Sequence, residues 1–306
     1  MTQSKIYVLG SINLDISIST SKIPQPAETV AGSSLLLTPG GKGANQAYGM
    51  SKYSTDIYMV GRVGDDIFAT NILEHFSNSQ LNTQNVSVDK NASTGLAVIS
   101  VDNQGENSIL AVYGANMECG QNEIDILTKS LSANDYLVIQ NEIPFHVNLK
   151  SAKLACEIGA KVIWDPAPYV QGSAELLKFV DIVTPNVLEA ESLSGINIDD
   201  DEGLLKALKW FKSHSKSLNP IITLGNDGVA YLNNDELEII SSFDVNVVDS
   251  VAAGDAFVAG LTIALSNSIP LDKAIVFAQA NAAVSVTKQG AQSSMPVINE
   301  VQQLLN

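Results

Sequence analysis

Short apolar runs alternate along the chain with longer segments of helical periodicity. The apolar runs predict strands at residues 6–10, 56–61, 135–140, 161–165, 181–186 and 220–225. Apolar positions at helical spacing predict helices at residues 43–52, 66–78, 147–158, 201–212 and 255–266. Continuous apolar runs are typical of strands that are buried on both faces of a parallel sheet. The pattern therefore predicts an α/β fold, with an open, mostly parallel sheet flanked by helices.

Two pairs of segments depart from this alternation. Residues 16–20 and 28–37 have β-type patterns without a helix between them, and residues 95–101 and 108–113 bracket the turn-like sequence DNQGEN. We expect these segments to form a small β-sheet lid over approximately residues 14–38 and 93–114. The chain shows no internal repeat and no low-complexity linker. We therefore expect one domain over residues 1–306, with a lid.

The composition excludes several classes of protein. The chain has 33 acidic and 17 basic residues, a net charge of −16 and a pI near 4.4. Apolar residues make up 45% of the chain and charged residues 16%, which is unlike a disordered protein. The acidic balance disfavours nucleic acid as a partner, and it gives no attraction to an anionic membrane surface.

The sequence also predicts a location. No run reaches the length of a membrane span, and the longest apolar stretch, residues 251–265, contains Asp255. The N-terminus lacks the pattern of a signal peptide. Cys119 and Cys156 form no CxxC pair, so we expect two free thiols in a reducing cytoplasm.

Polar residues follow several of the expected strands. Asn13 and Asp15 come after the first strand, Glu142 after residues 135–140, Asn186 after residues 181–185, and Gly225 closes the run that begins at residue 220. Ligands of open parallel sheets bind outside the carboxyl ends of the strands. Each residue alone is also compatible with a turn, but together they predict a binding site.

The sequence PGGKGANQA, residues 39–47, is the first motif with a chemical interpretation. Its glycines allow a close approach of the backbone to a ligand, while Lys42 and Asn45 provide donors and acceptors for hydroxyl groups. No Ser or Thr follows the lysine, so the segment is not a P-loop. The alternative is a helix N-terminus that is preceded by a glycine turn.

The sequence DSVAAGDAF, residues 249–257, is the second motif. Small residues precede a helix that we expect to begin near Asp255, so the N–H groups of its first turn form an anion hole. The Asp255 carboxylate beside this hole can accept a proton from a substrate hydroxyl, as phosphoryl transfer to an alcohol requires. The alternative is that Asp255 is an ordinary N-cap or first-turn acid.

Two further motifs carry weaker signals. In TPNVLE, Asn186 and Glu189 share a helix face and can orient Mg²⁺ through water; helix capping is the alternative. In TLGNDG, residues 223–228, a strand ends in a glycine turn that offers N–H groups to a nucleotide, although a hairpin turn explains it equally well. The three histidines do not have the spacing of a zinc site.

In combination these motifs resemble the ribokinase branch of the PfkB carbohydrate kinase family. The resemblance runs from about Ile6 to Pro296 and rests on six segments in family order, which are GSINLD (10–15), GGKGANQA (40–47), TPN..E (184–189), ITLG..G (222–228), DSVAAGDAF (249–257) and GAQSS (290–294). It implies a mostly parallel sheet with a β-sheet lid, a homodimer formed through the lid, and ATP-dependent phosphorylation of the 5-hydroxyl of D-ribose.

The resemblance also implies roles for individual residues. It makes Asp255 the catalytic base beside an anion hole of Ala252, Ala253, Gly254 and Asp255. The implied sugar contacts are Asn13, Asp15, Gly41, Lys42, Asn45, Glu142 and Asp255. The implied ATP contacts are Asn186, Thr223, Gly225, Gly228, Gly254 and Gln279. The family often has Gly in place of Ala252, and we expect this change to cost little because the hole uses backbone N–H groups.

The same branch binds a monovalent cation, usually K⁺, beside the anion hole. The matching positions are Asp249, Val251, Ser285, Lys288, Gly290 and Ser294, mostly through backbone carbonyls. Mg²⁺ is expected with the nucleotide, near Asn186 and Glu189. Two alternatives to D-ribose phosphorylation stay open: a kinase for a related sugar such as 2-deoxyribose, or a non-catalytic sensor of sugar or nucleotide.

Overall fold

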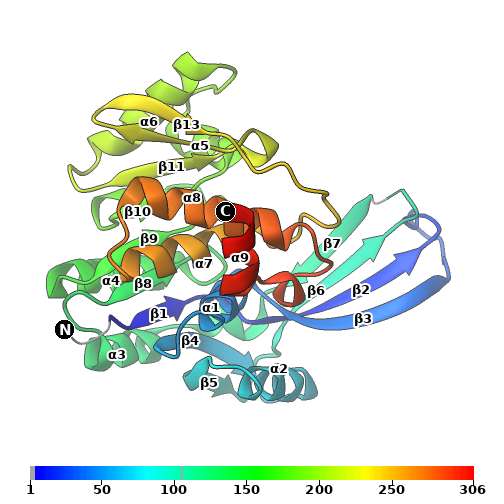
Figure 1. Ribbon diagram of the computed structural model, residues 1–306. Coiled ribbons are helices and arrows are strands. Elements are labelled where there is room, and N and C mark those ends of the chain that lie inside the picture. Colours follow the sequence, from blue (N-terminus) through cyan, green and yellow to red (C-terminus); the bar gives the residue numbers. More distant parts are fainter. Residues whose placement is uncertain (1–3, 105) are drawn as a thin grey trace.

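The computed structural model describes residues 4–104 and 106–306. One large sheet has nine strands in the order β13-β12-β11-β10-β9-β8-β1-β4-β5 (Figure 1). Its strands are β1 (Ile6–Leu9), β4 (Ile57–Gly64), β5 (Asn82–Asp89), β8 (Tyr136–Ile139), β9 (Lys161–Trp164), β10 (Ile182–Val183), β11 (Asn219–Thr223), β12 (Val229–Asn233) and β13 (Glu236–Ile240). The strands from β5 to β11 pair in parallel, whereas β12 and β13 run antiparallel at the edge. The expected mostly parallel sheet is confirmed.

Helices cover both faces of this sheet. The α-helices are α1 (Lys42–Ser51), α2 (Ile67–Ser77), α3 (Gln121–Ser130), α4 (Phe145–Ile158), α5 (Val187–Ser194), α6 (Asp201–Ser213), α7 (Ala253–Ser266), α8 (Leu271–Ser285) and α9 (Ile298–Leu305). Short 3-10 turns lie at Gly114–Glu118, Ser173–Lys178, Gly225–Asp227 and Gln292–Ser294. All six expected strands and all five expected helices are present within a few residues. The sequence interpretation did not name β5, β12, β13, α3, α5, α8 and α9.

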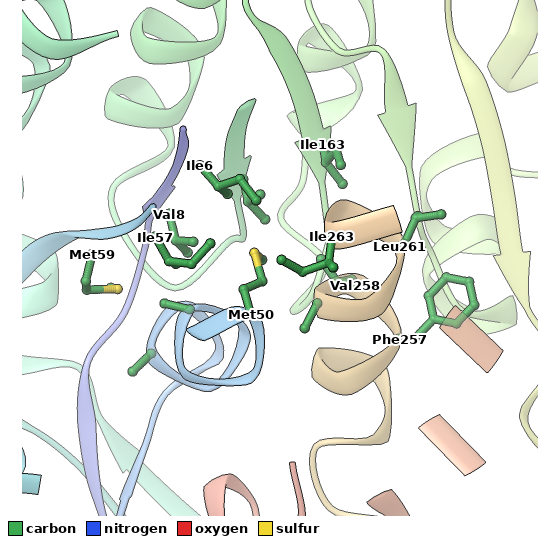
Figure 2. Close-up of a cluster of buried hydrophobic side chains, with 14 of the residues drawn as sticks. Ile6, Val8, Met50, Ile57, Met59, Ile163, Phe257, Val258, Leu261 and Ile263 are labelled. Carbon is green, nitrogen blue, oxygen red and sulfur yellow. The ribbon is translucent and has the colours of Figure 1, made fainter. Parts of the chain in front are cut away.

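The core forms two layers because successive side chains of a strand point to opposite faces. Ile6 and Val8 pack with α1, α2, α7 and α8, whereas Tyr7 and Leu9 pack with α3, α4, α5 and α6. Figure 2 shows the first layer, where Met50 of α1 and Ile263 of α7 meet the side chains of β1. Consequently α1 and α7 lie side by side, and their N-termini come together at the carboxyl end of β1 (Figure 1).

The lid is a separate sheet of four strands in the order β3-β2-β6-β7, and it projects from the body (Figure 1). Its strands are β2 (Asn13–Thr20), β3 (Gly32–Gly40), β6 (Gly95–Val101) and β7 (Asn107–Val112), so residues 28–31 lie outside it. Residue 105, in the expected turn of the lid, and residues 1–3, at the expected leader-free N-terminus, lie outside the described residues. The Asp66 carboxylate anchors the start of β6, since it accepts hydrogen bonds from Thr94 N at 2.8 Å and Thr94 Oγ1 at 2.7 Å.

Candidate active site

The glycines of residues 39–47 allow α1 to begin directly against the end of β1. Gly41 precedes the helix with a φ of 88°, a conformation that favours glycine. A Cβ atom at Gly43 would lie 2.7 Å from the backbone of Gly10 and Ser11, so any side chain there would push the helix away. The alternative interpretation of a helix start after a glycine turn is therefore confirmed. The same turn brings Lys42, Asn45 and Gln46 to the edge of the sheet.

The ammonium of Lys42 faces an unusual number of carboxylates. Burial alone would lower the pKa of Lys42, but the carboxylates of Asp165, Asp255, Glu142 and Glu189 outweigh it and raise this pKa above its usual range. Lys42 therefore stays charged, and it is the cation that offsets the negative charge of the site. These residues come from α1, from the ends of β8 and β9, and from the first turns of α5 and α7.

Glu142 fastens the start of α1 to the end of β1. Its Oε2 accepts a hydrogen bond from the backbone N of Lys42 at 3.1 Å and another from the hydroxyl of Ser11. The Ser11 hydroxyl in turn accepts one from Gly43 N at 3.3 Å. Ser11, which the sequence interpretation did not single out, thus acts as a link between these elements.

Asn13 and Asp15 project from the first strand of the lid. Asn13 is buried, and its Oδ1 accepts a hydrogen bond from Asn116 Nδ2 at 2.7 Å. Burial raises the pKa of Asp15 to about 7, and the nearby carboxylates of Glu142 and Asp255 add to this effect. The structure thus brings together the polar residues that the sequence predicts as sugar contacts.

Asp255 lies in the first turn of α7, 5% exposed, and does not cap the helix. Its Oδ2 accepts a hydrogen bond from Asn45 Nδ2 at 3.0 Å, and its Oδ1 accepts one from Gln46 Nε2 at 3.0 Å. Burial raises the pKa of Asp255, while Lys42 and the two amides oppose that rise. The carboxylate is therefore held in one orientation. It faces the residues predicted as sugar contacts, which we call the sugar cluster: Asn13, Asp15, Gly41, Lys42, Asn45 and Glu142.

The sequence interpretation missed Asp165, and it noted Gln46 only as a polar member of the motif at residues 39–47. Gln46 Nε2 donates to Asp165 Oδ2 at 2.8 Å as well as to Asp255, and Gln46 Oε1 accepts from Gln140 Nε2 at 2.7 Å. Burial raises the pKa of Asp165 to about 7, and Lys42 opposes the rise. Asp165 ends the apolar run 161–165, so the strand-end criterion that indicated Glu142 applies to it too.

The N-terminus of α7 presents backbone N–H groups beside Asp255. Within the part of the chain that the structure describes, the amides of Gly254 and Asp255 donate no hydrogen bond, and a Cβ atom at Gly254 would meet open space. Ala252 precedes the helix with a φ of 60°. The expectation that Ala costs little here was incomplete, since a left-handed backbone costs an L-residue about 1 kcal/mol.

A cavity of about 540 Å³ opens on the other side of this helix start. Its lining includes five of the predicted nucleotide contacts, which are Thr223, Gly225, Gly228, Gly254 and Gln279. Among its described lining residues there is no Lys or Arg. Asn186 is not in the lining, but it forms a β-bridge with Thr223. The Gln279 amide donates to the carbonyl of Ile240 at 2.8 Å.

Asn186 and Glu189 form a reciprocal helix cap. Asn186 Oδ1 accepts from Glu189 N, and Glu189 Oε2 accepts from Asn186 N, both at 2.9 Å. The capping interpretation is thus confirmed. The cap leaves Glu189 Oε1 outside these bonds, so an oxygen donor of the kind that Mg²⁺ prefers stays on this edge. Over residues 4–104 and 106–306, no group of three His, Cys, Asp or Glu side chains is arranged to hold a metal ion.

The positions predicted for K⁺ gather behind α7. Asp249 Oδ1 accepts from Val251 N at 3.0 Å, and Asp249 Oδ2 accepts from Gly290 N at 2.9 Å, so one carboxylate joins the two segments. The Lys288 ammonium pairs with Glu300 at 2.6 Å. The hydroxyls of Ser285 and Ser294 donate to carbonyls in their own segments.

In the described ranges, no helix is both long and apolar enough to cross a membrane.

The buried carboxyl of Asp165 predicts a pH-dependent stability. Between the unfolded pKa of about 3.9 and the folded pKa of about 7, the folded chain holds a proton that the unfolded chain releases. Stability therefore falls as the pH rises through this window. We expect Asp165→Asn to stabilise the protein at pH 8 by on the order of 3 kcal/mol, and by less at pH 5. Urea unfolding at both pH values measures this, with the exposed Asp235→Asn as control; an equal effect at both would contradict it.

Comparison with known proteins agrees with this site. The profile described as "pfkB family carbohydrate kinase" matches residues 3–298. The chain is 36% identical to the ribokinase of Haemophilus influenzae and 32% identical to the deoxyribokinase of Salmonella typhi, with 98% of each chain covered in both cases. A structure of Arabidopsis thaliana ribokinase complexed with ribose and ATP has a TM-score of 0.87 and 28% identity, and covers 100% of this chain and 99% of that one. This chain therefore belongs to the pfkB family of carbohydrate kinases.

Proposed function

We propose that the protein transfers the terminal phosphoryl group of ATP to the 5-hydroxyl of D-ribose. One observation carries this proposal: Asp255 faces the sugar cluster, while the adjacent Gly254 lines the 540 Å³ cavity. This arrangement supports a base and an anion hole between the two predicted substrates. The relatives named ribokinase, and the relative complexed with ribose and ATP, support the assignment of substrates.

Phosphoryl transfer requires positioning and charge stabilisation. Asn13, Asp15 and Glu142 bind the sugar hydroxyls and orient the 5-hydroxyl toward Asp255. The ionised Asp255 carboxylate accepts the hydroxyl proton as the oxygen attacks phosphorus. The N–H groups of Gly254 and Asp255 stabilise the charge on the transferring group.

Two cations complete the proposal. Glu189, with Asn186, would hold Mg²⁺ through water on the nucleotide side, and the ion would neutralise phosphate charge. Asp249 and the backbone around Val251 and Gly290 would hold K⁺ behind the anion hole. The pairing of Lys288 with Glu300 supports a role for the Lys288 carbonyl, because its ammonium is held elsewhere.

The alternative substrate is 2-deoxyribose, which the Salmonella relative supports by its name. The two sugars differ by one hydroxyl, and a site built to bond that hydroxyl discriminates strongly against its absence. A non-catalytic sensor is disfavoured, because Lys42, Asn186, Gly254 and Asp255 are all present.

We also propose a homodimer formed through the lid, in the cytoplasm. Leu37, Leu110 and Val112 are 46%, 73% and 56% exposed. Their register places them on one face of the lid, opposite to the face that carries Asp15. A second copy packed on this outer face would cover these apolar side chains. The free thiols of Cys119 and Cys156 support the proposed location in the cytoplasm, where thiols stay reduced.

Replacing the proposed base tests the reaction. We expect Asp255→Asn to lower kcat by at least about 10³-fold, since general-base catalysis contributes 10²–10⁴-fold, while ribose still binds. A coupled ADP assay over ribose, 2-deoxyribose and other pentoses measures turnover, and calorimetry measures binding. Near-normal turnover of this variant would remove Asp255 from the role, and a wild-type protein inactive with every sugar would contradict the proposed function.

Exchange of the monovalent ion tests the second cation site. We expect lower kcat in Na⁺ than in K⁺, because a smaller ion fits a carbonyl cage of fixed size less well. Asp249→Asn is expected to weaken the response to K⁺, whereas Asp235→Asn, on a distant turn, keeps it. Equal rates of the wild type in both salts would contradict the cation site.

A charged side chain on the outer face of the lid tests the proposed dimer. We expect Leu110→Asp to produce a monomer, because a carboxylate would be buried without a partner in the interface. Light scattering after size-exclusion chromatography measures the mass, and Ile239→Asp, at an exposed site on β13, is the control. A monomeric wild type would overturn this proposal.

A further inference from the structure

A chain of side-chain amides leads away from Asp255. Asn45 donates from Nδ2 to Asp255, and its Oδ1 accepts a hydrogen bond from Gln292 Nε2 at 3.2 Å. Gln292 is 3% exposed and comes from the GAQSS segment near the C-terminus. A side-chain amide has a donor end and an acceptor end. The orientation of Gln292 therefore decides which end of Asn45 faces the base.

His75 lies at the far end of this chain. It comes from the last turn of α2 and stacks on Tyr48 with 4.9 Å between ring centroids. Tyr48 follows Asn45 by three residues on α1, so the two share a helix face. His75 Nε2 and Gln292 Oε1 are both buried, and within the described residues neither atom has a hydrogen-bond partner. Burial lowers the pKa of His75, and Gln292 is the side chain that opposes this.

We propose that His75 is a positioning residue for Asp255 and acts through Gln292 and Asn45. The inference rests on the proposed function, in which Asp255 is the base. In this proposal, an N–H group on His75 Nε2 donates to the unpaired Gln292 Oε1. That bond keeps Gln292 Nε2 directed to Asn45 Oδ1 and Asn45 Nδ2 directed to Asp255. The neutral Nε2–H tautomer and the imidazolium both provide this donor.

If the hydrogen bonds through the amides of Gln292 and Asn45 ran in the opposite direction, they would not stabilise an ionised Asp255. Without a donor at residue 75, the side-chain amides of Gln292 and Asn45 can both flip. Asn45 Oδ1 then faces the Asp255 carboxylate. An acceptor beside a carboxylate favours its protonated form and raises its pKa. The donor on His75 therefore keeps Asp255 ionised to lower pH.

Other charged groups also act on Asp255, and they are left in place by a change at residue 75. Lys42 of α1 lowers the pKa of Asp255, while Glu142 raises it. Asp15 of the lid and Asp165 at the end of β9 are further carboxylates coupled to it. Lys52 is the charged neighbour of His75 itself. A shift seen only when the donor is lost thus reports the amide chain.

Two substitutions at residue 75 separate the donor from the ring. His75→Phe keeps an aromatic ring against Tyr48 but has no donor, whereas His75→Gln provides a donor at a similar reach without a ring. We expect His75→Phe to move the acidic limb of the kcat profile upward by about one pH unit, with kcat about tenfold lower below the limb. His75→Gln is expected to lie near the wild type, and so is the exposed Glu74→Gln.

A second measurement does not depend on turnover. The ¹³C carboxyl signal of Asp255, identified by its loss in Asp255→Asn, gives its pKa directly in the wild type and both variants. If His75→Phe does not fold, Gln292→Met interrupts the same chain, and the same upward shift is expected. An unchanged Asp255 pKa without the donor, or equal shifts in His75→Phe and His75→Gln, would overturn the proposal. Absence of sugar phosphorylation by the wild type would instead refute the proposed function, while the titration still decides the role of His75.

Discussion

The active end of the molecule depends on a balance of charge around Lys42. Carboxylates of four different segments converge on this one ammonium, and none of them would be stable there as an unpaired buried charge. The balance requires α1 to start within contact distance of β1, which the glycine-rich turn permits. A neutral donor also contributes, since the amide nitrogen of Gln46 donates to both Asp165 and Asp255. Packing, hydrogen bonding and electrostatics are therefore not separable at this site.

Much of this arrangement follows from the sequence because it depends on local pattern. The buried strands and their carboxyl ends were predictable from apolar runs, and so were Asn13, Asp15 and Glu142. The helix α8 was not, since it packs on α7, α9 and the body at once and is apolar nearly all round, which removes the periodic signal. The amide network was not predictable either. Gln46, Gln140 and Gln292 have no pattern of their own, and their roles arise only from contacts between residues far apart in the chain.

Local and functional interpretations of a motif also proved compatible. The turn before α1 is a helix start, and the same geometry delivers Lys42 to the site. Asn186 and Glu189 cap α5, and Asn186 also pairs with Thr223, which lines the cavity that we propose for the nucleotide. A helix N-terminus supplies free N–H groups for structural reasons, so a site that binds anions by backbone needs few cationic side chains. The proposed nucleotide site is therefore compatible with a cavity that has no Lys or Arg in its described lining.

The crowding of carboxylates would also affect the substrate and the product of the proposed sugar pocket differently. A free sugar is neutral, so it would enter the proposed shell of Asp15, Glu142 and Asp255 without Coulomb repulsion. After the transfer, the sugar carries a phosphate with about two negative charges at neutral pH, held against the same acidic shell and a single lysine. The proposed reaction would thus convert a ligand that the pocket accommodates into one that the acidic shell repels. The charge that the enzyme adds would then favour release of the product.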